Sequence, residues 1–140
     1  MKSLTQEWIE KAEGDYRVAT REAEIKDEPA YEAICFHSQQ CIEKYAKAFL
    51  QEQSIEPKRT HDMEFLLAEC AQVDEDFKKY LADFAMLDDY SVDARYPGGH
   101  ASKEDAENAV ECMKRARLFI RSKLNLPEED SPKEGNEPEK

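Results

Sequence analysis

The chain has 140 residues, the usual size of one domain, and 40% of them are hydrophobic and 37% charged. Its formal net charge of −12 excludes broad electrostatic binding to duplex DNA, which needs a surplus of Lys and Arg, but allows a local pocket for a nucleotide or a short single strand of RNA. Few glycines, no apolar run of about 20 residues and a polar start predict a helical, cytoplasmic protein that does not enter a membrane.

Two long helices are predicted first, over residues 3–25 and 29–52. Ser3 and Gln6 have capping-box spacing, so we expect Ser3 to cap the first helix. An apolar stripe then recurs at steps of three and four, formed by Trp8, Ala12, Tyr16, Ala19 and Ala23. The second helix has two adjoining faces that suit packing, and such a helix is usually central. These faces comprise Ala33, Phe36, Gln40, Glu43 and Lys47, and Ile34, His37, Cys41, Lys44 and Ala48.

A short third helix is predicted from Thr60, which we expect to be its cap, to Glu69. A fourth helix is predicted over residues 74–90. Its inner face should comprise Phe77, Tyr80, Leu81, Phe84 and Leu87. The sequence Pro97-Gly98-Gly99 follows, and it cannot be part of a continuous helix at ordinary cost. We therefore expect residues 91–101 to form a loop.

Ser102 and Asp105 resemble another helix cap and predict the start of a fifth helix. Its inner face should comprise Ala106, Ala109, Val110, Met113, Arg117, Ile120 and Leu124. From Pro127 onward the chain has six acidic and two basic residues, a net charge of −4, and too few apolar residues to fold. We expect an all-α fold, an up-and-down bundle of about five helices over residues 1–126, with a disordered acidic tail over residues 127–140.

One face of the second helix is a candidate site, formed by His37, Gln40, Cys41 and Lys44 at steps of three and four. Polar groups on a packing face must be hydrogen-bonded, because burying one without a partner costs about 1–3 kcal/mol. The face therefore predicts an internal network, a homodimer seam or a cleft for a ligand. His61, between Thr60 and Asp62, is a further candidate, or it is only a surface imidazole beside a helix cap.

A second candidate site surrounds the Pro-Gly-Gly sequence. Arg95 can clamp a phosphate, and His100, five residues later, can shuttle protons near neutral pH. Together they could cleave RNA without a metal, by activating a ribose 2′-hydroxyl. Alternatively, Arg95 pairs with an aspartate and His100 is a solvated loop residue. Asp88 and Asp89 could hold a divalent ion, but adjacent acids are more often solvated or paired with arginine.

Other chemistries have no support in the sequence. The four cysteines show neither C-x-x-C spacing nor a histidine at zinc spacing, which indicates free thiols in a reducing compartment. There is no P-loop, no H-E-x-x-H and no G-x-S-x-G motif. We expect no metal and no cofactor.

The chain resembles the prokaryotic HEPN family over residues 8–124. The resemblance rests on the order and spacing of Trp8-Ile9-Glu10-Lys11-Ala12-Glu13-Gly14-Asp15, Phe36-His37-Ser38-Gln39-Gln40, Glu43-Lys44, Lys47-Ala48, Thr60-His61-Asp62, Leu87-Asp88-Asp89-Tyr90 and Ala94-Arg95-Tyr96-Pro97. It implies a helical bundle that commonly dimerises and is often encoded beside a minimal nucleotidyltransferase. Catalytic members resemble metal-independent ribonucleases with an arginine, four to six residues and a histidine, which here would be Arg95 and His100.

A Pro-Gly-Gly loop should hold Arg95 and His100 loosely, which favours a binding role over an enzymatic one. Two departures from the family's patterns accompany it, the first in the catalytic motif and the second in the motif for control by modification. Tyr96 follows the arginine, where catalytic members usually have a small polar residue in a helical stretch. Ser102 stands where toxin members that are modified by their nucleotidyltransferase have a tyrosine. We expect a nucleotide-binding or partner subunit of a toxin–antitoxin-like pair; the alternatives are a ribonuclease toxin and a helical protein-interaction module. The candidate nucleotide-binding or cleft residues are His37, Gln40, Lys44, His61, Asp88, Asp89 and Tyr96.

Overall fold

A computed structural model describes residues 1–95, 97 and 99–128, without the side chains of residues 91–95. In chain order its elements are α1 (Ser3–Ala23), α2 (Tyr31–Glu52), α3 (Met63–Val73), the 3-10 helix η1 (Glu75–Tyr80), α4 (Leu81–Arg95) and α5 (Lys103–Lys123). The described residues form no strand, so the predicted all-α bundle of about five helices is confirmed. Most of the predicted tail, residues 129–140, lies outside the described residues.

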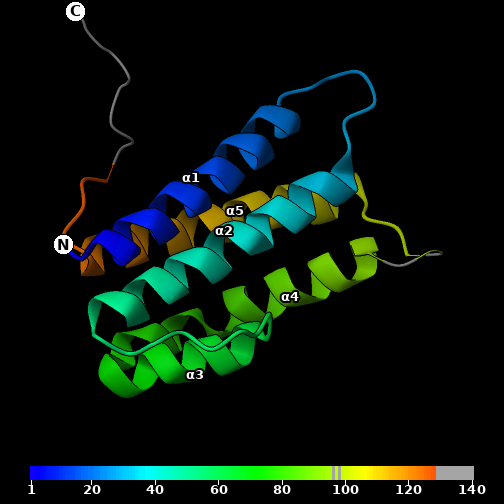
Figure 1. The fold of residues 1–140 in the computed structure, drawn as a ribbon. Helices are drawn as coiled ribbons and strands as arrows, with labels where there is room; N and C mark the ends of the chain where they lie inside the picture. Colours follow the sequence, from blue (N-terminus) through cyan, green and yellow to red (C-terminus); the bar gives the residue numbers. More distant parts are fainter. Residues whose placement is uncertain (96, 98, 129–140) are drawn as a thin grey trace, which may run out of the picture.

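Helix α2 is central, as its two packing faces predicted (Figure 1). It contacts α1 and α5 on one side and α3 and α4 on the other. Most of its side chains from Ile34 to Leu50 are buried, whereas α1 and α5 bury one stripe each. The α1–α2 and α4–α5 connections lie at the same end of the bundle, opposite the N-terminus (Figure 1). None of the described helices is long and apolar enough to cross a membrane.

The first and third helices begin differently from the prediction. Lys2, which has no side-chain cap, precedes α1, so the capping box expected at Ser3 does not form. Instead, the backbone N–H of Lys2 donates to the carboxylate of Glu52, 3.1 Å away at the end of α2. The cap of α3 is Asp62 rather than Thr60, because the Asp62 carboxylate accepts from the backbone N–H of Phe65 at 3.0 Å.

The predicted fourth helix is two elements, η1 and α4. A 3-10 helix has three residues per turn instead of 3.6, so the predicted inner face loses its register and Leu81 is 51% exposed. Helix α4 ends at Arg95 rather than Tyr90, since no glycine or proline intervenes.

The capping interaction predicted before the fifth helix is confirmed. The Ser102 hydroxyl accepts from the backbone N–H of Asp105 at 3.0 Å, and the Ser102 N–H donates to the Asp105 carboxylate at 3.1 Å. The predicted inner face of α5 is buried except for Val110, which is half-buried.

Candidate functional site

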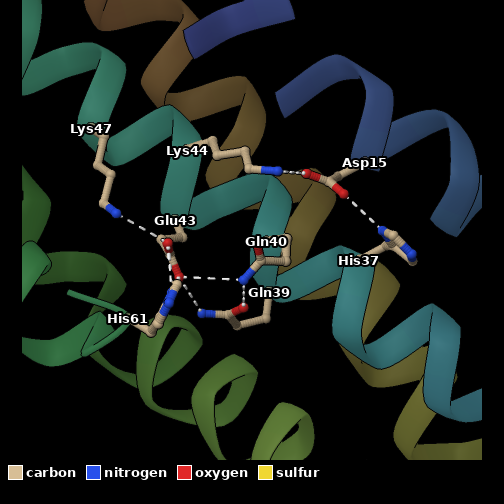
Figure 2. Close-up of polar contacts among 8 residues, drawn as sticks. All are labelled: Asp15, His37, Gln39, Gln40, Glu43, Lys44, Lys47 and His61. Carbon is tan, nitrogen blue, oxygen red and sulfur yellow. Dashed lines mark hydrogen bonds and ion pairs between the residues drawn. The ribbon is translucent and has the colours of Figure 1, made fainter. Parts of the chain in front are cut away.

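The carboxylate of Glu43 is the centre of a polar cluster on α2 (Figure 2). It is 3% exposed and accepts hydrogen bonds from the side-chain amides of Gln39 at 3.0 Å and Gln40 at 3.4 Å. The Lys47 ammonium lies 3.1 Å away, and Nδ1 of His61 lies 3.0 Å from both carboxylate oxygens. The imidazole of His61 is itself 70% exposed. The contact with His61 thus holds the α2–α3 connection against α2. The buried Glu43 carboxylate also has the hydrogen-bond and ion-pair partners that its burial requires.

A second carboxylate, that of Asp15 on α1, has a similar role on the same helix (Figure 2). It is 10% exposed and lies 2.7 Å from Nδ1 of His37 and 2.6 Å from the ammonium of Lys44. These two contacts connect α1 to α2. Each carboxylate, Asp15 or Glu43, therefore holds one imidazole and one lysine.

The four predicted residues at α2 belong to two separate clusters. His37 and Lys44 contact Asp15, whereas Gln40 and His61 contact Glu43. Positions 37 and 43 differ by about 9 Å along the helix axis, so the two imidazoles are anchored at separate points. In each cluster the lysine is paired with the carboxylate, so its ammonium is already engaged and is poorly placed to bind a phosphate. The geometry thus favours the internal-network interpretation of this face.

The four cysteines are free thiols, and all four are buried. Burial raises the pKa of Cys35 to about 12, and burial together with the charge of Asp83 raises that of Cys112 to about 12. Burial also raises the pKa of Cys41, on the polar face of α2, well above its ordinary value. A thiol must lose its proton to act as a nucleophile, so these cysteines are unsuited to covalent catalysis.

A third polar cluster, around Glu13, was not predicted. The guanidinium of Arg117 donates two hydrogen bonds to the Glu13 carboxylate, at 2.8 and 2.9 Å. The Tyr45 hydroxyl donates to the same carboxylate and accepts from Arg121 at 2.9 Å. Burial and the Glu13 charge raise the pKa of Tyr45. This cluster joins α1, α2 and α5; its one signal in the sequence was a charged residue, Arg117, within the apolar stripe of the fifth helix.

The residues predicted around the Pro-Gly-Gly sequence lie on or after α4. Asp88 is half-buried and Asp89 exposed. Arg95 is the last residue of α4, so the expectation that it lies in a loop is wrong. Its side chain and all of Tyr96 lie outside the described residues, whereas His100 is exposed. Among the described residues, no three His, Cys, Asp or Glu side chains are grouped as a metal site requires.

A groove of about 930 Å³ lies between the first half of α5 and the segment that links α1 to α2. Its apolar lining comprises Ala23, Ile25, Pro29, Tyr31, Ile34, Ala106 and Val110. Its exposed rim carries the charged residues Glu24, Lys26, Lys103, Glu107, Glu111 and Lys114. The Glu22 carboxylate accepts from the backbone N–H of Ala30 at 2.7 Å, which fixes the α1–α2 connection beside the groove.

The charged side chains of the rim, unlike those on α2, are not paired with other side chains. Within the described part of the chain, none of the six forms a hydrogen bond or an ion pair through its side chain. Lys44 and Lys47, by contrast, are both paired with carboxylates. Ligand sites usually have an apolar lining and a few polar groups that can form hydrogen bonds or ion pairs with the ligand. The groove was not predicted from the sequence, because the sequence pattern of an exposed charged helix face is the same with or without a neighbouring segment that forms a groove.

Fold and groove define a small helical-bundle protein with a candidate ligand site at one end. The HEPN domain model matches residues 5–123, and the chain therefore belongs to the HEPN family. It is similar to TT1696 from Thermus thermophilus, with a TM-score of 0.72 and 25% identity over 88% of this chain and 100% of that one. It is also similar to ST0689, an archaeal HEPN homologue, with a TM-score of 0.68 and 29% identity over 89% and 99% of the two chains. No curated protein matches it.

Proposed function

We propose that this HEPN protein is a nucleotide-binding subunit that works as a homodimer beside a minimal nucleotidyltransferase, in a toxin–antitoxin-like pair of the cytoplasm. The observation that carries the proposal is the groove between α5 and the α1–α2 connection. Its volume of about 930 Å³ suits a small molecule, since ligand pockets usually measure about 300–1,000 Å³.

The residues of the groove match the parts of a nucleotide. Tyr31 offers an aromatic ring against which a base can stack, a contact worth about 1–3 kcal/mol per base. Lys26, Lys103 and Lys114 offer ammonium groups to phosphate oxygens. The imidazoles and lysines on α2 are already satisfied by carboxylates, so they support this proposal less well than the groove does.

The net charge of −12 does not rule out phosphate binding at this position. At physiological ionic strength the screening length is about 8 Å, so the charges nearest to the ligand dominate. The rim carries three lysines and three glutamates and so has no net charge, but within the described residues its lysines are not ion-paired and can contact a phosphate group. Binding should weaken as salt concentration rises, because these lysines are exposed.

The experiment is a calorimetric titration with ATP of the wild type and of a Lys103→Ala/Lys114→Ala variant. A charged hydrogen bond is worth about 1.5–3 kcal/mol, so the variant should bind at least about ten-fold more weakly. Lys78→Ala, an exposed lysine on η1 away from the groove, is the matched control and should bind as the wild type does. Equal affinity for all three proteins would place the nucleotide elsewhere. Absence of binding at millimolar ATP would refute the nucleotide-binding role and leave the ribonuclease and the helical protein-interaction module.

The homodimer and the nucleotidyltransferase partner are proposed from membership of the family. Sedimentation velocity at micromolar concentration should give the mass of a dimer, and a monomer alone would contradict it. The proposal requires a minimal nucleotidyltransferase gene beside this one, and co-expression of the two proteins should yield a complex that survives gel filtration. Separate elution of the two proteins would refute the pairing.

A second candidate function, a metal-independent ribonuclease, is favoured by one observation. Arg95 stands at the end of helix α4 rather than in a loop, and His100 is exposed a few residues beyond it. The test is cleavage of RNA in EDTA by the wild type, Arg95→Ala and His100→Ala. Cutting that leaves cyclic-phosphate ends and vanishes in both variants would establish the ribonuclease. No cutting above a mock preparation would remove it.

A further inference from the structure

The charged residues that α5 contributes to the groove follow a definite order. Lys103 and Lys114 stand at the two ends, and Glu107 and Glu111 lie between them. Because an α-helix rises about 1.5 Å per residue, the lysines are about 16 Å apart and the two glutamates about 6 Å apart along the axis. The groove therefore offers positive charge at its ends and carboxylates at its middle.

We propose that this order selects a single ribonucleotide, whose ribose hydroxyls donate hydrogen bonds to Glu107 or Glu111 while its phosphates contact a lysine; this inference rests on the proposed function. Carboxylates accept hydrogen bonds and cannot donate them, so they suit the 2′- and 3′-hydroxyls of ribose. The same pairing of a carboxylate with a ribose hydroxyl is used by dinucleotide-binding folds. Hydrogen bonds to an ionised acceptor are about twice as strong as neutral ones.

The carboxylates also argue against a strand of RNA in the groove. A strand carries one phosphate per nucleotide, so a strand laid along α5 would place a phosphate beside Glu107 or Glu111. Glu107 and Glu111 are exposed, and like charges at contact repel even at a protein surface. A mononucleotide avoids this conflict, because all its phosphates extend from one end of the ribose.

The charge order also disfavours one arrangement of a second copy of this helix. If the same segment of another α5 lay antiparallel with its ends aligned, Lys103 would face Lys114, and the glutamates would lie within one residue of facing each other. These pairings are repulsive, and like-charge pairs suppress association.

The test compares ATP, dATP and a trinucleotide of adenosine in calorimetric titrations. The wild type should bind ATP about ten-fold more tightly than dATP, because the deoxy sugar lacks the 2′-hydroxyl that donates to a carboxylate. Glu107→Ala/Glu111→Ala should reduce this preference to less than about three-fold. Alanine at exposed helical positions keeps the helix intact. Glu104→Ala, an exposed acid of α5 outside the groove lining, should keep the preference of the wild type.

The outcomes separate this inference from the proposed function. Equal affinity for ATP and dATP, with ATP binding still lost in Lys103→Ala/Lys114→Ala, would overturn the ribose selection and leave the nucleotide site intact. Tighter binding of the trinucleotide than of ATP would overturn the single-nucleotide claim. No binding of ATP would overturn both. A preference for ATP that survives in Glu107→Ala/Glu111→Ala would show that other groups select the sugar.

Discussion

Replacing Glu43 by leucine should destabilise the fold severely. The Glu43 carboxylate is 3% exposed and is paired with the ammonium of Lys47, which is 7% exposed. Without the carboxylate, the lysine remains a buried charge with no anionic partner. Breaking a buried ion pair in this way typically costs about 3–5 kcal/mol. Total stabilities of domains are about 5–15 kcal/mol, so the loss is a large fraction of what holds the protein together.

The assay is urea unfolding followed by tryptophan fluorescence. The chain has one tryptophan, Trp8, and the Lys47 ammonium lies 5.5 Å from the centre of its ring, so the probe reports on the affected region. Lys47→Met should cost a similar amount, because it leaves Glu43 without its lysine. The double variant Glu43→Leu/Lys47→Met has no unpaired charge and should cost at least about 1 kcal/mol less than the sum of the two single losses. A loss below about 1 kcal/mol for Glu43→Leu, or strict additivity, would refute the buried-pair reasoning.

Three further predictions concern other parts of the bundle. Ser102→Ala should lower stability by about 1 kcal/mol, measured by urea unfolding, because it removes the cap of α5; no change would mean that the cap contributes nothing. Hydrogen bonds from Lys123 hold the pKa of Asp74 and of Asp76 below the ordinary value. The wild type should therefore exceed Lys123→Met in stability above about pH 5, and the difference should vanish as pH falls through the folded-state pKa values, below about 3.9; a difference that grew in acid would contradict the assignment. The four buried thiols should resist alkylation at pH 8 in the native protein and all react after unfolding; fast native labelling would contradict their burial.

The helices were largely predictable because their signals are local. Apolar periodicity located all five predicted helices, and Ser102 with Asp105 marked the start of the last one correctly. Errors occurred where several local signals competed. Thr60 and Asp62 are both good capping residues, and only the structure shows that Asp62 is the cap. The 3-10 segment before α4 changed the register of a face that was predicted from a period of 3.6.

The site was less predictable, because it depends on which distant residues meet. Periodicity placed His37 and Lys44 on one face, but it could not show that Asp15, from another helix, satisfies both. The groove depends on how the α1–α2 connection packs beside α5, a contact between segments about 80 residues apart. No local pattern distinguishes Lys103 or Lys114 from an ordinary solvated lysine.

The most direct test of the central claim is a nitrogen-15 correlation spectrum of the protein titrated with ATP. The account predicts that the amide shifts that move are those of residues 23–31 and 103–114, which line the groove. The amides of residues 37–47 and of His61 should stay in place, since their polar side chains are already paired. Shifts confined to residues 37–47 and 61 would contradict the account and make the polar face of α2 the nucleotide site.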